Sequence, residues 1–124
     1  MGRTVLVVDD DADIRMILRD FLSDAGFVVH TAQDGVDAFH LLDRIDVPDL
    51  ILLDYKMPNM DGKQFLAGKR RMPRLQNIPV VILSAATREW SGAYLESIAV
   101  LSKPVDLHSV LSIVSRICVE RPSA

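Results

Sequence analysis

Acidic, hydroxyl and basic side chains follow four short apolar runs of the sequence. The runs span residues 4–8, 50–53, 78–83 and 98–101, and the polar residues behind them are Asp9 and Asp10, Asp54, Ser84 and Lys103. Each has an ordinary explanation alone, as a cap of the following helix or turn, a turn hydroxyl or a solvated charge. Their shared place at the ends of four apolar runs points instead to one site.

The residue types of this set indicate phosphoryl chemistry around a metal ion. Three crowded carboxylates repel one another unless a cation lies among them. Oxygen ligands without His or Cys select Mg²⁺ or Mn²⁺, and Mg²⁺ keeps waters and accepts phosphate oxygens. Asp54 is then a candidate nucleophile for an aspartyl phosphate, with Asp9 and Asp10 holding the metal directly or through water. The Lys103 ammonium and the Ser84 hydroxyl would contact the oxygens of the transferred group.

The apolar runs predict the strands that position these residues. Residues 50–53 are all branched aliphatics, which is typical of a strand buried on both faces of a parallel sheet. A weaker run at 27–31 predicts an edge strand. Helical spacing and capping residues predict helices between the strands: one capped by Asp11 or Asp13 and stopped by Gly26, one from Asp34-Gly35 to before Pro48, one after Gly62, a short one within 87–96 and a last one over 107–118.

This alternation of strand and helix predicts a doubly wound α/β fold. The expected sheet has five parallel strands in a flavodoxin-like order 2-1-3-4-5, with helices on both faces and right-handed crossovers. Residues just past parallel strands share one crevice at the carboxyl edge of the sheet. The polar residues at the run ends are therefore expected to meet there.

Length and composition limit the function classes. The chain has 124 residues, of which 49% are hydrophobic and 25% charged, which suits one globular domain. We assign residues 1–120 to that domain and 121–124 to a frayed tail or the start of a linker. A net charge of −3 argues against nucleic acid as the main partner. A single cysteine, Cys118, fits a buried thiol in a reducing compartment, and no apolar run reaches the ~20 residues of a membrane span, so we expect a cytoplasmic domain.

These motifs resemble the receiver domain of bacterial two-component response regulators, the CheY-like family. The matching stretches are Val-Leu-Val-Val-Asp-Asp at 5–10, Leu-Leu-Asp-Tyr-Lys-Met-Pro-Asn-Met-Asp-Gly at 52–62, Leu-Ser-Ala at 83–85 and Ser-Lys-Pro at 102–104. The resemblance covers essentially the whole chain.

The resemblance implies a phosphoacceptor rather than an enzyme that turns over a substrate. Asp54 would accept a phosphoryl group from a histidine kinase or histidine phosphotransfer protein and lose it slowly to water. Mg²⁺ would bind Asp9, Asp10, Asp54 and the backbone carbonyl of Lys56, while Ser84 and Lys103 would contact the phosphoryl oxygens. A monomer or weak dimer would then present a changed surface to a downstream protein.

Three departures from the family pattern bear on that output surface. Val100 stands where the family often has an aromatic residue that turns inward on phosphorylation. The interval from Ser84 to Lys103 is shorter than usual, which predicts a short or irregular helix within 87–96. Val105 replaces a frequent phenylalanine. These changes leave phosphate acceptance untouched and predict an output switch unlike the usual one.

Three other function classes fit parts of the pattern. A phosphatase that turns over through an aspartyl phosphate commonly has an acid two residues after the nucleophile, where this chain has Lys56. A flavodoxin-like nucleotide binder needs a Gly or Ser/Thr loop after the first strand, where Asp9–Asp11 would repel phosphate. A scaffold without phosphorylation is disfavoured because all the site residues are present.

Two further surface features are open to interpretation. The basic run of Lys69, Arg70, Arg71 and Arg74 is predicted to be a solvated face, with docking of an acidic partner as the alternative. Trp90 and Tyr94, four residues apart, are expected to pack in the fold, or else to form a partner-binding stripe.

Overall fold

The strands form one parallel sheet with the predicted order. A computed structural model describes residues 3–84 and 99–120. The strands are β1 (Thr4–Val8), β2 (Val28–Ala32), β3 (Leu50–Asp54), β4 (Val80–Ser84) and β5 (Ala99–Ser102). Their order in the five-stranded sheet is β2-β1-β3-β4-β5, so β2 lies at an edge as expected. The predicted strands are confirmed and differ only at their ends.

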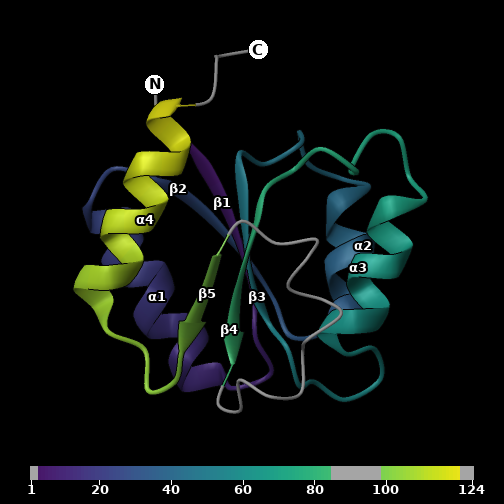
Figure 1. The fold of residues 1–124 in the computed structure, drawn as a ribbon, viewed down its shortest axis with the longest axis horizontal. Helices are drawn as coiled ribbons and strands as arrows, with labels where there is room; N and C mark the ends of the chain where they lie inside the picture. The colour runs from purple at the N-terminus through teal and green to yellow at the C-terminus, as the bar shows by residue number, and fades with distance from the viewer. Residues whose placement is uncertain (1–2, 85–98, 121–124) are drawn as a thin grey trace.

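Helices cover both faces of the sheet. They are α1 (Ala12–Asp24), α2 (Gly35–Leu42), α3 (Gly62–Arg70) and α4 (Leu107–Glu120). Figure 1 shows α1 and α4 on one face and α2 and α3 on the other, which confirms the doubly wound architecture. The predicted helix within 87–96, with Trp90 and Tyr94, and the tail 121–124 lie outside the described residues. Within the described ranges, no helix has the length and apolar character needed to cross a membrane.

Aspartates cap the first three helices, of which the sequence predicted the caps of α1 and α2. Asp11, not Asp13, caps α1, and Asp34 caps α2. Asp61 caps α3 in a capping box, in which Asp61 Oδ1 accepts the Gln64 N–H and Gln64 Oε1 accepts the Asp61 N–H. At the other end of α1, Gly26 has φ +99°, a conformation that a side chain would strain. Local chemistry therefore sets these helix boundaries.

The core consists of two apolar layers, one on each side of the sheet. Residues of β1, β3 and β4 alternate between the layers; for example, Leu53 joins the layer of α2 and α3 while Leu52 joins that of α1 and α4. All residues of β3 and β4 are buried, which confirms the prediction of a strand covered on both faces. Cys118 is buried in the second layer, as expected.

The basic run at the end of α3 is largely a solvated face, and that prediction is wrong for Lys69 but holds for Arg74, which is exposed. Lys69 is 5% exposed, and its Nζ donates to the Gln76 carbonyl at 3.1 Å. Arg74 donates to the carbonyls of Leu42 and Ile45, both at 2.6 Å. Arg74 thereby satisfies backbone acceptors that the end of α2 leaves open. Arg70 and Arg71 are exposed as predicted.

Candidate functional site

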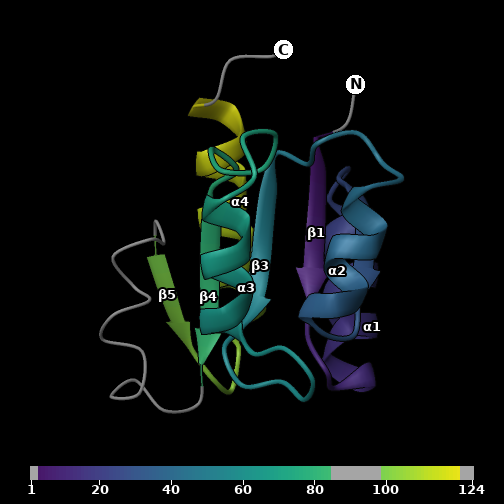
Figure 2. The same ribbon diagram turned by 90° about the vertical axis from the view of Figure 1, so that its right-hand side faces the viewer.

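The register of the sheet brings the predicted site residues to one edge. Val8 pairs with Leu53, so Asp9 lies beside Asp54 where the two strands end. Ser84 ends the next strand, β4. Figure 2 shows the strands running in one direction, with their carboxyl ends toward the bottom of the view. The polar groups predicted to converge thus belong to neighbouring strand ends.

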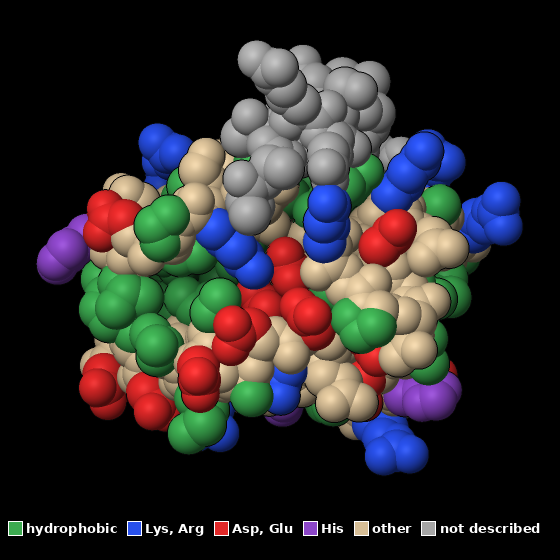
Figure 3. Space-filling model, turned by 90° about the horizontal axis from the view of Figure 1, so that it is seen from below, with side chains coloured by type: hydrophobic (Ala, Val, Ile, Leu, Met, Phe, Trp, Pro, Cys, Tyr) green, Lys and Arg blue, Asp and Glu red, His purple; other side chains and the backbone are tan. Residues whose placement is uncertain are grey.

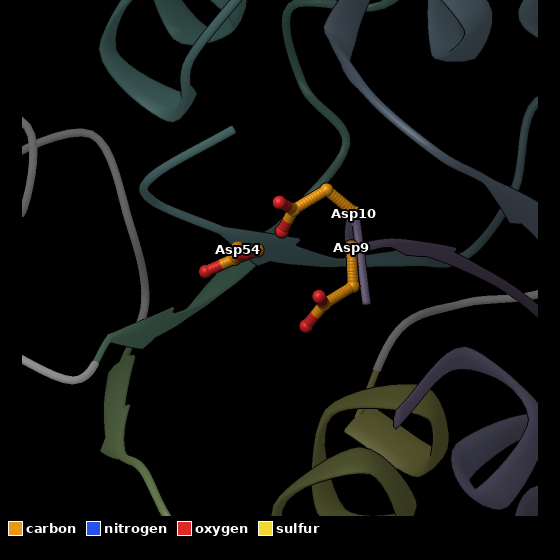
Figure 4. Close-up of side chains that lie close together, drawn as sticks. All are labelled: Asp9, Asp10 and Asp54. Carbon is orange, nitrogen blue, oxygen red and sulfur yellow. The ribbon is translucent and has the colours of Figure 1, made fainter. Parts of the chain in front are cut away.

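Three aspartates form a compact acidic cluster at this edge. One carboxylate oxygen from each of Asp9, Asp10 and Asp54 lies within 4.8 Å of the others. In Figure 4 the first two side chains extend from the chain after β1 and the third from the end of β3. Asp9 is fully buried and Asp54 is 4% exposed, whereas Asp10 is exposed. Figure 3 shows acidic side chains at the centre of this face with basic ones beside them.

Burial and crowding make ionisation of Asp54 costly. Removal from water, the negative charge of Asp9 and a hydrogen bond with Asp10 together raise the pKa of Asp54, to about 7. The ammonium of Lys103 acts in the opposite direction without cancelling them. A carboxylate with so high a pKa gains from any cation that enters the cluster.

Lys103 bridges two of the carboxylates. Its Nζ lies 3.1 Å from Asp9 Oδ2 and 3.1 Å from Asp54 Oδ1. Burial lowers the pKa of Lys103, but the two carboxylates outweigh this effect and the net pKa is raised. Its backbone N–H donates to the Ser84 carbonyl at 2.9 Å, which ties the residue after β5 to the end of β4. Lys103 is therefore a fixed cation within the cluster.

The donor set fits a divalent cation. The three ionised carboxylates against one ammonium leave a local charge of −2, which a divalent cation would balance. All three side-chain donors are oxygens, the ligands that Mg²⁺ prefers. Asp9, Asp10 and Asp54 are thus the residues able to hold a metal, with an exposed side, at Asp10, open to solvent and substrate.

Backbone contacts hold Asp9 in place. Its Oδ1 accepts the N–H of Asp11 at 2.9 Å, in the turn that starts α1. Its carbonyl accepts a hydrogen bond from Nη1 of Arg15 at 2.6 Å. Sequence reasoning missed Arg15, because an arginine on the first turns of a helix carries no sign of which carbonyl it will reach.

The loop after Asp54 is closed tightly at its base. Gly62 N–H donates to the Tyr55 carbonyl at 2.7 Å, and a Cβ at Gly62 would lie 2.9 Å from Tyr55 Cα. Only glycine allows this approach. Lys56 is exposed on the loop, and Met57 is buried in the core beside α2 and α3. The loop therefore has a defined path past the acidic cluster.

The two predicted output residues lie on the two sides of the sheet. Val100 pairs with Ile82 and packs against the layer of α2 and α3, whereas Val105 packs against the layer of α1 and α4. Val100 is half-buried. The prediction of an unusual output switch stays a prediction, since the segment 85–98 is outside the described residues.

Comparisons with known proteins agree with this arrangement. The sequence model of the family described as the response regulator receiver domain matches residues 5–115 of this chain. The chain is 37% identical over 121 residues to an uncharacterized 14.6 kDa protein of Leptolyngbya boryana, covering 95% of this chain and 92% of that one. It is 36% identical over 117 residues to response regulator Rre1 of Synechocystis, covering 90% of this chain but 49% of that longer protein.

A solved structure shows the same fold. Chemotaxis response regulator CheY4 of Vibrio cholerae superposes with a TM-score of 0.85 at 29% identity, covering 94% of this chain and 99% of that one. The family match covers the three strand ends that carry Asp9, Asp54 and Lys103. The chain therefore belongs to the family of response regulator receiver domains.

Proposed function

We propose that this receiver domain accepts a phosphoryl group on Asp54 from a histidine kinase or a histidine phosphotransfer protein, with Mg²⁺ as the cofactor. The observation that carries the proposal is the cluster of Asp9, Asp10 and Asp54 with Lys103 bridging two of its members. Mn²⁺ has the same ligand preferences and is the alternative metal.

Each residue has a distinct part in the transfer. A carboxylate oxygen of Asp54 attacks the phosphorus of the phosphohistidine, and the bond from phosphorus to the imidazole nitrogen breaks. Lys103 places a positive charge where the phosphoryl oxygens gain negative charge, and the Ser84 hydroxyl donates a hydrogen bond to one of them. When bound by Asp9, Asp10, Asp54 and the Lys56 carbonyl, Mg²⁺ supplies further charge stabilisation at those oxygens. The positions of these residues at one edge support the assignment.

The surface beside the cluster suggests where the phosphodonor protein docks. Met16 and Ile17 of α1 are both 52% exposed, a large exposure for apolar side chains. An apolar groove next to them is lined by Ile14, Ile17, Leu18, Lys103, Pro104, Val105 and Leu107. Because Lys103 belongs to both groove and cluster, a donor protein docked on this groove would lie next to Asp54. Ile17→Ser is expected to slow transfer from a phosphorylated histidine phosphotransfer protein and to leave labelling by acetyl phosphate unchanged.

The proposal describes a signalling domain with a single phosphorylation per cycle. Slow attack of water on the aspartyl phosphate returns Asp54 to a carboxylate. The phosphorylated state would bias a surface that binds a downstream protein, not nucleic acid or membrane, as a monomer or weak dimer. The buried thiol of Cys118 and a kinase-linked partner suit the cytoplasm.

Intact mass spectrometry tests the phosphoacceptor. Wild type, Asp54→Asn and Asp61→Asn are incubated with acetyl phosphate, with and without Mg²⁺. Asp61→Asn is the matched control, because it changes a carboxylate near the same loop and keeps an oxygen that can cap α3. We expect a Mg²⁺-dependent phosphate adduct, labile to hydroxylamine, on wild type and Asp61→Asn alone. An equal adduct on Asp54→Asn, or none on folded wild type that binds Mg²⁺, would contradict the proposal, and the second result would favour a scaffold.

A further inference from the structure

A buried carboxylate joins the start of α2 to the loop that follows the phosphoacceptor strand. Asp34 is 4% exposed. Its Oδ1 accepts the N–H of Asp37 at 2.8 Å, which caps α2, and its Oδ2 accepts Nδ2 of Asn59 at 2.9 Å. The two oxygens therefore have separate tasks, one within its own helix and one on the loop.

Further contacts join the same two segments. The N–H of Gly35 donates to the Met60 carbonyl at 3.3 Å. A Cβ at Gly35 would lie 2.7 Å from Cγ and Sδ of Met60, so the absence of a side chain is what lets the loop lie against α2. Asn59 has φ +66°, a conformation that asparagine adopts more readily than most residues. This end of the loop is thus fixed by both side-chain and backbone contacts.

The other end of the loop is fixed at the acidic cluster. Lys56 lies two residues after Asp54 and three before Asn59. On one side of Lys56, the Tyr55 carbonyl accepts a hydrogen bond from Gly62 N–H, and on the other side Met57 is buried in the core. The Lys56 backbone therefore belongs to a short segment with anchors on both sides. Only three peptide units separate Asn59 from Lys56.

We propose that Asp34, acting through Asn59, is a positioning residue for the Lys56 carbonyl and so for metal binding at the acidic cluster. The inference rests on the proposed function, which assigns that carbonyl to Mg²⁺. Asp34 contacts neither the metal ligands nor the phosphoryl group. It lowers the freedom of the loop before binding, and a ligand already held in place loses less entropy when the metal arrives.

A purely structural role for Asp34, as the cap of α2, makes a different prediction. Asn59→Gly separates the two roles: it removes the donor to Asp34, keeps a residue suited to φ +66°, and leaves the bond from Asp37 N–H intact. A capping role alone leaves Mg²⁺ affinity unchanged in this variant. A positioning role weakens it.

Isothermal titration calorimetry with MgCl₂ measures the difference on the whole chain. We expect the Kd for Mg²⁺ to rise about tenfold in Asn59→Gly and to a similar degree in Asp34→Asn. Asp37→Asn is the matched control for Asp34→Asn, because it removes one negative charge from the first turn of the same helix and keeps an oxygen that can accept from Gln33 N–H. Its Kd is expected to stay at the wild-type value.

An exchanged pair provides a second measurement. In Asp34→Asn with Asn59→Asp, an amide at position 34 can donate to a carboxylate at position 59, which restores the bond at unchanged net charge. We expect this double variant to recover most of the wild-type Mg²⁺ affinity that Asp34→Asn alone loses. If Asn59→Gly does not fold, the comparison of Asp34→Asn with the exchanged pair decides the matter.

The outcomes separate this inference from the proposed function. Wild-type affinity in folded Asn59→Gly, or a folded exchanged pair as weak as Asp34→Asn, would overturn the positioning role and leave Asp54 as phosphoacceptor. Wild-type protein that binds no Mg²⁺ and takes no phosphate from acetyl phosphate would instead refute the proposed function, and the positioning role with it.

Discussion

Two aspartates of this domain have the same exposed fraction and opposite acidities. Asp34 and Asp54 are each 4% exposed. Hydrogen bonds from the Asp37 N–H and from the Asn59 amide lower the pKa of Asp34 below its ordinary value. Desolvation, Asp9 and Asp10 raise the pKa of Asp54 to about 7. The exposed fraction alone therefore does not decide the acidity of a carboxylate in this fold.

Desolvation is the largest cause of the raised pKa at Asp54 and a smaller cause at Asp34, and the neighbours of each carboxylate widen the difference. Asp34 faces donors on both oxygens, so its charge is stabilised where it lies. Asp54 faces two other carboxylates, and the single ammonium of Lys103 is shared with Asp9. A carboxylate with hydrogen-bond donors on both oxygens stabilises the fold, whereas one crowded by other carboxylates favours binding of a cation and reaction with an electrophile. The same residue type thus serves the scaffold in one place and chemistry in the other.

Removal of the Asp34 side chain has the largest expected effect on stability. Asp34→Ala loses the cap of α2, at about 1 kcal/mol, and the charge-assisted bond to Asn59, at about 1–2 kcal/mol. We expect the free energy of unfolding at pH 7 to fall by about 2–3 kcal/mol in urea titrations. Asp34→Asn, which keeps the capping oxygen, is the control and is expected to lose less. A loss below about 0.5 kcal/mol in Asp34→Ala would show that Asp34 does not stabilise the fold.

The sequence predicts Asp54 far better than it predicts the environment of Asp34. The carboxyl ends of parallel strands lie at one edge of the sheet, so the ends of four apolar segments were enough to place Asp9, Asp54, Ser84 and Lys103 along that edge. The same reasoning recovered the strand order and the helix caps, because these depend on hydrophobic period and local hydrogen bonds.

Contacts between distant segments were beyond that reasoning. Asp34 and Asn59 each carry a local signal, a cap and a turn, but nothing in the chain says that they meet 25 residues apart. The hydrogen bonds of Arg74 were not predicted either, since a sequence does not show which carbonyls the end of α2 leaves open. Polar residues that act through tertiary contacts follow no sequence periodicity from which those contacts could be predicted.

Replacement of Asp54 is expected to raise the free energy of unfolding, whereas replacement of Asp34 lowers it. Without divalent cation at pH 8, wild type must keep Asp54 ionised beside Asp9, whereas Asp54→Asn carries no charge there. We expect the variant to be about 1–2 kcal/mol more stable in urea titrations, less than the full pKa shift implies because effective protein dielectrics are high.

The pH dependence identifies the source of that gain. The pKa of Asp54 is about 7 in the folded state and near 3.8 in the unfolded chain. Between these values the native state binds the extra proton, so the contribution of Asp54 to stability falls as pH rises from about 4 to 7. Asp54→Asn lacks this fall, so the difference in stability between the two proteins is expected to be less than half as large at pH 5 as at pH 8 and to vanish near pH 4. An equal difference at pH 5 and pH 8 would show that the gain is not electrostatic.

Added Mg²⁺ is expected to relieve the crowding in wild type. A ligand at ten times its Kd stabilises the native state by about 1.4 kcal/mol. We expect that shift in thermal or urea unfolding of wild type at pH 8 and a smaller one in Asp54→Asn, which lacks one of the three carboxylates. Asp34→Asn should show a reduced shift at the same Mg²⁺ concentration if Asp34 positions the loop. Ca²⁺ at equal ionic strength controls for screening, because its larger size suits this small cluster less well.

The smallest expected effect separates capping from burial. Asp61 caps α3 as Asp34 caps α2, with its Oδ1 accepting Gln64 N–H at 2.8 Å, but it is only half-buried. Asp61→Ala is expected to cost about 1 kcal/mol in urea titrations, the usual value of a cap, and Asp61→Asn very little. A cost as large as that of Asp34→Ala would mean that burial and the bond to Asn59 add nothing to a cap. The contrast between Asp34 and Asp54 would then rest on the crowding around Asp54 alone.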